Sequence, residues 1–231
     1  MGPQNLPAEL ARVRERIAQA AAAAGRSAQS VTLLAVGKSQ PAAMLDAAAN
    51  CGVSDFGESY LQEGLGKIAA LHDRTLTWHF IGRIQANKTR PIAEEFAWVH
   101  AVDRVKVAER LSAQRPYHAP ALNVCLQVNV AGEATKGGVT PEELPALAAA
   151  VAALPRLTLR GLMCIPPEET DPARQRAWFA RLRALQEGLN ARGAGLDTLS
   201  MGMSADFETA ILEGATIVRI GTALFGERPR H

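Results

Sequence analysis

The sequence has few cysteines, little net charge and no long apolar run, and each shortage excludes a class of protein. Its three cysteines are an odd number and lie far apart, without the spacing of a metal site or a disulfide framework. The 25 basic and 23 acidic residues leave a net charge of +2, which is too small an excess of positive charge to indicate a nucleic-acid-binding protein. A signal peptide and the ~20 apolar residues of a membrane span are also missing. We therefore expect a cytoplasmic protein in a reducing compartment, with no metal and with neither nucleic acid nor membrane as a partner.

Strand-like and helix-like segments alternate along the whole chain. The strand-like segments fall at residues 31–36, about 55–56, 77–81, 97–102, 121–130, 157–165, 196–201 and 216–220. Such alternation predicts an α/β fold with a parallel sheet, and eight units favour a closed barrel over an open sheet. No Gly-x-Gly-x-x-Gly follows the first strand, which weakens a dinucleotide-binding interpretation. We predict one (β/α)8 TIM-barrel domain over residues 1–231, with a loose tail over residues 1–6 and an extra helix from Pro7.

Lys38 stands at the end of the first apolar strand, just after Gly37. In a barrel the chemistry lies at the carboxyl ends of the strands. Desolvation there lowers the pKa of an ammonium group, and the neutral amine can form a Schiff base with an aldehyde. The alternative is that Lys38 only marks the point where the chain leaves the core.

Two loops after the last strands have the composition of a phosphate site. They read Ser200-Met-Gly-Met-Ser204 and Arg219-Ile-Gly-Thr222. Glycine lets a ligand approach the backbone, and hydroxyls and free N–H groups donate to phosphate oxygens. A barrel usually binds phosphate after strands seven and eight. Ser204 as a helix cap and Gly221 as a turn would explain either loop alone, but they explain the pair less well.

Two polar residues are predicted inside strands and need partners. Arg219 lies on a strand that should be buried, so its guanidinium must meet a carboxylate such as Glu58 or Asp206, a backbone carbonyl or a ligand. His79 lies in a strand of alternating character, and we interpret it as a hydrogen-bonded core histidine. A catalytic base is the alternative for His79.

Seven short motifs together resemble one known family. They are Ala35-Val-Gly-Lys38, Phe56-Gly-Glu-Ser-Tyr60, Trp78-His-Phe-Ile-Gly82, Gln85-Ala-Asn-Lys88, Gly161-Leu-Met163, Leu199-Ser-Met-Gly-Met-Ser204 and Val218-Arg-Ile-Gly-Thr222. In this order and spacing, from about residue 30 to 226, the chain resembles the pyridoxal phosphate homeostasis protein family. The resemblance implies a barrel like the N-terminal domain of alanine racemase, the fold type III of pyridoxal phosphate proteins.

The resemblance also implies a cofactor site. Pyridoxal 5'-phosphate would be held as a Schiff base on Lys38, and Arg219 would face its pyridine nitrogen. The other residues that the resemblance assigns to the cofactor are Ser200, Met203, Ser204, Gly221 and Thr222, with Lys136 as a candidate for accepting or relaying it. Ser59 stands where relatives usually have asparagine close to the cofactor, and Gly37 stands where serine is common.

The predicted function is to hold pyridoxal phosphate and to buffer or deliver it in vitamin B6 homeostasis, with apoenzymes as partners. We expect a monomer that is no enzyme, because alanine racemase uses a second domain that closes the site and supplies a tyrosine. This sequence ends soon after its eighth strand, and its only tyrosines are Tyr60 and Tyr117. A small amino-acid racemase and a Schiff-base aldolase acting on a sugar phosphate are the alternatives.

Overall fold

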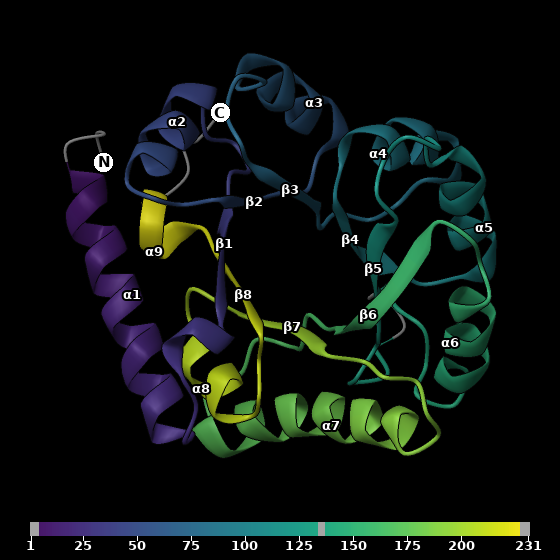
Figure 1. Cartoon of the computed structure of the whole chain (residues 1–231). Helices are drawn as coiled ribbons and strands as arrows, with labels where there is room; N and C mark the ends of the chain where they lie inside the picture. Colours follow the sequence, from purple (N-terminus) through teal and green to yellow (C-terminus); the bar gives the residue numbers. More distant parts are fainter. Residues whose placement is uncertain (1–4, 134–136, 227–231) are drawn as a thin grey trace.

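The strands of the computed structural model form a closed, parallel barrel (Figure 1). The structure describes residues 5–133 and 137–226. The strands are β1 (Thr32–Val36), β2 (Asp55–Glu58), β3 (Thr77–Phe80), β4 (Trp98–Val102), β5 (Leu122–Gln127), β6 (Leu157–Met163), β7 (Thr198–Met203) and β8 (Ile217–Ile220). Each strand pairs with the next along the chain, and β8 closes the ring on β1 with Arg219 beside Leu34. The predicted barrel is confirmed.

Helices surround the ring of strands (Figure 1). They are α1 (Leu6–Ala23), α2 (Ala42–Asn50), α3 (Leu61–Ala70), α4 (Thr89–Glu95), α5 (Val105–Gln114), α6 (Leu144–Ala152), α7 (Pro172–Asn190), α8 (Phe207–Leu212) and α9 (Thr222–Phe225), with short 3₁₀ turns η2 (Ala28–Ser30) and η3 (Ala86–Lys88). Helix α9 was not predicted, because four residues are too few for a periodic pattern. No helix in the described part of the chain is long and apolar enough to cross a membrane.

The extra N-terminal helix packs on the outside of the barrel beside α8 and α9 (Figure 1). Leu10, Val13 and Ile17 recur at helical spacing and are all buried, so one apolar face of α1 covers this side. The predicted tail over residues 1–6 is too long. Leu6 already belongs to α1, and only 3% of it is exposed, because its side chain joins the same apolar face.

The middle of the barrel is polar. His79, His100, Ser200 and Arg219 are each the third residue of their strand, and each is almost completely buried. Barrel interiors are usually filled by branched apolar side chains. A buried polar group costs free energy unless it finds a hydrogen-bond partner, so this layer needs partners for all four side chains.

Candidate functional site

Lys38 lies at the carboxyl end of the barrel, directly after β1. It is half-buried, and its Nζ lies 4.6 Å from the centroid of the Tyr60 ring, in a cation–π contact. Lys38 also lines a small cavity together with Gly221 and Thr222. The structure therefore brings the predicted amine next to the predicted phosphate loop after β8.

The loops after β7 and β8 lie side by side. The Ser204 hydroxyl oxygen accepts hydrogen bonds from the backbone N–H groups of Gly221 (3.3 Å) and Ala223 (3.2 Å). In the same loop the Met203 N–H donates to Oδ1 of Asp206 at 2.5 Å. Ser204 is thus more than a helix cap, since it ties the two loops into one polar surface. Thr222 is exposed at this surface.

Ser200 takes a different place from the other predicted phosphate residues. It is fully buried in the barrel interior, and its hydroxyl lies 2.9 Å from Nη1 of Arg219 and 2.8 Å from Nδ1 of His100. The structure therefore separates Ser200 from Ser204, although one loop sequence contains both. A contact between Ser200 and phosphate stays a prediction.

Arg219 finds its partners among neutral oxygens. Its guanidinium donates to the backbone carbonyl of Ser200 (2.7 Å), to the Ser200 hydroxyl and to the carbonyl of Cys164 (2.8 Å). Of the partners considered from sequence, the backbone carbonyl is the one found, in place of an ion pair with Glu58 or Asp206. Burial lowers the pKa of Arg219 from its ordinary value. A guanidinium nevertheless keeps its positive charge in proteins.

Two predicted residues lie apart from this cluster or outside the described residues. Ser59 lines a separate cavity of about 280 Å³ with Tyr60, Arg83 and Lys88, and Lys38 is not among the residues that line it. A role of Ser59 at the cofactor stays a prediction. Lys136 lies outside the described residues.

A buried ion cluster beneath Lys38 was not predicted from the sequence. Nζ of Lys67 donates to the carbonyl of Gly37 (2.6 Å), to Glu58 (2.8 Å) and to Glu63 (2.5 Å). Glu63 also accepts from the N–H of Ser39 at 2.6 Å. The cluster therefore holds the backbone on both sides of Lys38. The spacing of Glu63 and Lys67, four residues apart on α3, was the available signal.

The same cluster explains one departure from the family pattern. A Cβ atom at position 37 would press on Oε1 of Glu58 and on the side chain of Leu45. Gly37 leaves room for the Glu58 carboxylate directly under the turn that carries Lys38. Burial raises the pKa of Glu58 to about 7, against the opposing effect of Lys67.

Known proteins resemble this chain over nearly its whole length, and they support the family resemblance found in the sequence motifs. Residues 9–229 match the family model for the alanine racemase N-terminal domain. The chain is 64% identical over 219 residues to the pyridoxal phosphate homeostasis protein of Pseudomonas aeruginosa, with 95% of this chain and 94% of the relative covered. It is 49% identical over 222 residues to the protein of that name from Escherichia coli, with 95% of each covered.

Solved structures support the fold and the family. PipY of Synechococcus elongatus, solved without PLP, has a TM-score of 0.86 at 37% identity, and 96% of this chain and 100% of that chain are covered. The PLP-bound PipY structure has a TM-score of 0.80 at 38% identity, with 91% and 100% covered. Alanine racemase of Clostridium difficile, at 14% identity and a TM-score of 0.78, shares the fold over 98% of this chain and 58% of its own. The chain belongs to the alanine racemase N-terminal domain family and, within it, to the pyridoxal phosphate homeostasis proteins.

Proposed function

We propose that this protein binds pyridoxal 5'-phosphate covalently through Lys38 and buffers or delivers it in vitamin B6 homeostasis. The observation that carries the proposal is the shared cavity of Lys38, Gly221 and Thr222 beside the Ser204 bridge. An amine that can bind an aldehyde thus lies next to hydroxyl groups that suit a phosphate. The PLP-bound relative PipY, at 38% identity, gives the proposal independent support.

The residues present fit the chemical groups of this cofactor. The amine of Lys38 suits the aldehyde, and Ser204 and Thr222 supply hydroxyls for the phosphate, with Met203 and Gly221 in the same loops. The guanidinium of Arg219 would hold a positive charge near the pyridine nitrogen and disfavour its protonation. When bound, the cofactor supplies a reversible imine and an acceptor for electrons. Arg219 at the ring would weaken this electron acceptor without acting on the amine of Lys38.

We infer a carrier rather than an enzyme from the same residues. A racemase needs an acid–base group on each side of the reacting carbon, and Tyr60 uses its ring face to contact Lys38. Tyr117 follows α5 and so lies toward the amino-terminal side of the barrel. The relatives at 64% and 49% identity are named for homeostasis. We further propose that the protein is a cytoplasmic monomer. The free thiols of Cys51, Cys125 and Cys164 support the cytoplasmic location, because thiols stay reduced there.

Borohydride reduction tests the covalent link. The protein is incubated with pyridoxal phosphate, reduced and digested, and the modified peptide is identified by mass spectrometry. We expect modification at Lys38 and loss of the visible imine band in Lys38→Ala. Lys88→Ala is the matched control and should keep the band, because Lys88 lies in the separate cavity with Ser59. An imine that persists in Lys38→Ala, for example on Lys136, would overturn the assignment.

Exchange of the α-proton separates carrier from racemase. The loaded protein is incubated in D2O with several amino acids, and deuterium at the α-carbon is followed by NMR. A carrier releases cofactor to the amines with little exchange, whereas a racemase exchanges the α-proton with many turnovers. A protein that stays colourless with pyridoxal phosphate would favour the aldolase alternative.

A further inference from the structure

A continuous chain of hydrogen bonds crosses the barrel from its amino-terminal end to Arg219. Oδ1 of Asp55, the first residue of β2, lies 3.1 Å from Nε2 of His79. Nδ1 of His79 lies 2.9 Å from Nε2 of His100, and Nδ1 of His100 lies 2.8 Å from the Ser200 hydroxyl. Nη1 of Arg219 completes the chain, 2.9 Å from that hydroxyl. Five side chains from β2, β3, β4, β7 and β8 are thereby joined.

The donors of this chain can point in one direction only. An ionised aspartate only accepts and a neutral imidazole has one donor and one acceptor nitrogen, so Asp55 and two neutral rings together fix the direction. Arg219 donates to Ser200, and the Ser200 hydroxyl donates to Nδ1 of His100 because a neutral His100 protonated on Nε2 has its lone pair there. His100 then donates through Nε2–H to His79, which donates through its own Nε2–H to Asp55. Two neutral imidazoles in this chain therefore both carry their proton on Nε2.

The electrostatics of the three titratable partners agree with this assignment. Burial lowers the pKa of His79 and holds that of His100 well below its ordinary value, so both rings are neutral. Burial acts on Asp55 in the opposite sense, but hydrogen bonds from His79 and Ser54 bring its pKa below the ordinary value. Asp55 is consequently ionised, as the direction of the chain requires.

We propose that His79, His100 and Ser200 are positioning residues that hold Arg219 in one orientation and link it to the carboxylate of Asp55. The orientation of Arg219 follows directly from the geometry. Its consequence for the cofactor rests on the proposed function, in which Arg219 faces the pyridine ring. Aligned hydrogen bonds polarise one another, so the negative charge of Asp55 makes each group along the chain a better acceptor, up to the Ser200 oxygen that accepts from Arg219.

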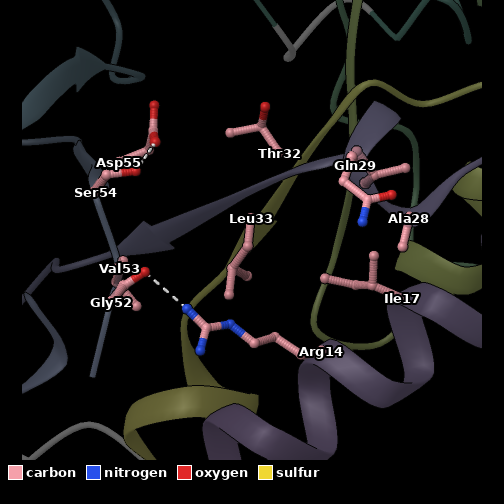
Figure 2. A pocket seen from close by; sticks show the side chains of 11 residues that line it. Arg14, Ile17, Ala28, Gln29, Thr32, Leu33, Gly52, Val53, Ser54 and Asp55 are labelled. Atoms are coloured by element: carbon pink, nitrogen blue, oxygen red, sulfur yellow. Dashed lines mark hydrogen bonds between the residues drawn. The ribbon is translucent and has the colours of Figure 1, made fainter.

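The Asp55 end of the chain opens to the surface. Asp55 and Ser54 lie next to each other on the wall of a cavity of about 470 Å³ at the amino-terminal end of the barrel, and α1 contributes Arg14 to the same cavity (Figure 2). Arg14 is occupied with the carbonyls of Cys51 (3.1 Å) and Gly52 (2.7 Å). The carboxylate of Asp55 can therefore be changed without touching residues at the Lys38 end.

Imidazole tautomers test the chain without any cofactor. Long-range ¹H–¹⁵N correlation spectra of the protein, before pyridoxal phosphate is added, report which ring nitrogens carry protons. We expect His79 and His100 to be neutral with the proton on Nε2. A charged ring or a proton on Nδ1 at either residue would overturn the proposal. In Asp55→Asn the new amide can donate as well as accept, so a population with Nδ1–H should appear at both rings, and unchanged tautomers would contradict the link.

The loaded protein tests the consequence for Arg219. His100→Phe and Ser200→Ala should shift the visible band and weaken pyridoxal phosphate binding by about tenfold, the loss expected for a hydrogen bond to a charged group. Ser112→Ala is the matched control. Ser112 is also buried and hydrogen-bonded, but it donates to the carbonyl of Pro155 and takes no part in the hydrogen bonds that lead to Arg219. His100→Gln can still accept and donate, and it should restore part of the band position.

The two parts of the proposal fail separately. If the wild-type protein binds no pyridoxal phosphate, the proposed function is wrong. The imidazole tautomers still show whether the hydrogen bonds from Asp55 to Arg219 form in the proposed direction. If the cofactor binds and His100→Phe leaves both its band and its affinity unchanged, the positioning role is wrong.

Discussion

Two buried cations have different partners, and only one of them, Lys67, is neutralised by carboxylates. Lys67 is 5% exposed and contacts the carboxylates of Glu58 and Glu63. Arg219 is 4% exposed, and its hydrogen bonds go to the neutral oxygens of Ser200 and Cys164. One cation is therefore compensated where it stands, and the other keeps its positive field.

The difference separates structure from binding. A buried ammonium between carboxylates has little field left for a ligand, and its loss would strand buried negative charge. A guanidinium fixed by neutral acceptors is oriented without being neutralised, which suits a group that must act on a ligand. Lys67 therefore supports the turn under Lys38, while the surroundings of Arg219 suit the role proposed for it at the cofactor.

The largest expected effect comes from removing Lys67. Lys67→Met keeps the apolar stem and leaves Glu58 and Glu63 without a cation, so we expect a loss of about 3–5 kcal/mol in the free energy of unfolding. Urea unfolding of the purified protein measures it. Adding Glu58→Leu to Lys67→Met removes the stranded carboxylate and should recover much of the loss. A single variant as stable as wild type would abolish the contrast between the two cations.

The pH dependence of stability isolates Glu58. Its pKa is raised from 4.5 to about 7, so the folded state binds this proton more tightly than the unfolded state. The contribution to stability is complete below pH 4.5 and is lost as the pH rises to about 7, up to about 3 kcal/mol. Glu58→Gln should remove this slope. The difference between wild-type and variant unfolding free energies from pH 4.5 to 7.5 measures it, and parallel curves would refute the role of Glu58.

Replacing Arg219 should cost less stability and more binding. Arg219→Leu strands no carboxylate and leaves only neutral acceptors without a donor, at about 1–3 kcal/mol. Urea unfolding should therefore show a smaller loss than for Lys67→Met, while the cofactor's visible band and affinity change strongly. If Arg219→Leu loses more stability than Lys67→Met, the neutral partners of Arg219 do not make its removal less costly than that of Lys67, and the contrast between the two cations is wrong.

The sequence was sufficient for features that depend on a few neighbouring residues. Strand and helix periods predicted the eight units, and the positions of Lys38, Ser204 and Gly221 at strand ends predicted that they would meet. The interpretation of His79 as a hydrogen-bonded core histidine is confirmed by its contacts with His100 and Asp55.

Contacts across the barrel could not be predicted in the same way. Ser200 and His100 are 100 residues apart in the chain and meet only because β4 and β7 face each other across the barrel. The sequence pattern placed Ser200 with Ser204 because it shows strand ends but not the direction of each side chain. The partners of Arg219 could not be predicted for the same reason. The folded strands bring the backbone carbonyls of Ser200 and Cys164 within hydrogen-bond distance of its guanidinium, and these are not neighbours in sequence.

The smallest expected effect concerns a carboxylate near Arg219 that is not bonded to it. Asp206 accepts from the Met203 N–H in the predicted phosphate loop, and burial raises the pKa of Asp206 against the effects of that N–H and of Arg219. Asp206→Asn keeps an acceptor for Met203 and removes the negative charge, so inorganic phosphate should bind about threefold to fivefold more tightly, a gain of ~1 kcal/mol or less. Calorimetric titration measures it, with Glu208→Gln on α8 as the control, since Glu208 pairs with Arg16 of α1 at 2.8 Å. Unchanged affinity in Asp206→Asn would mean that the positive field of Arg219 at this loop is not offset by the Asp206 carboxylate, and the contrast with Lys67 would become sharper still.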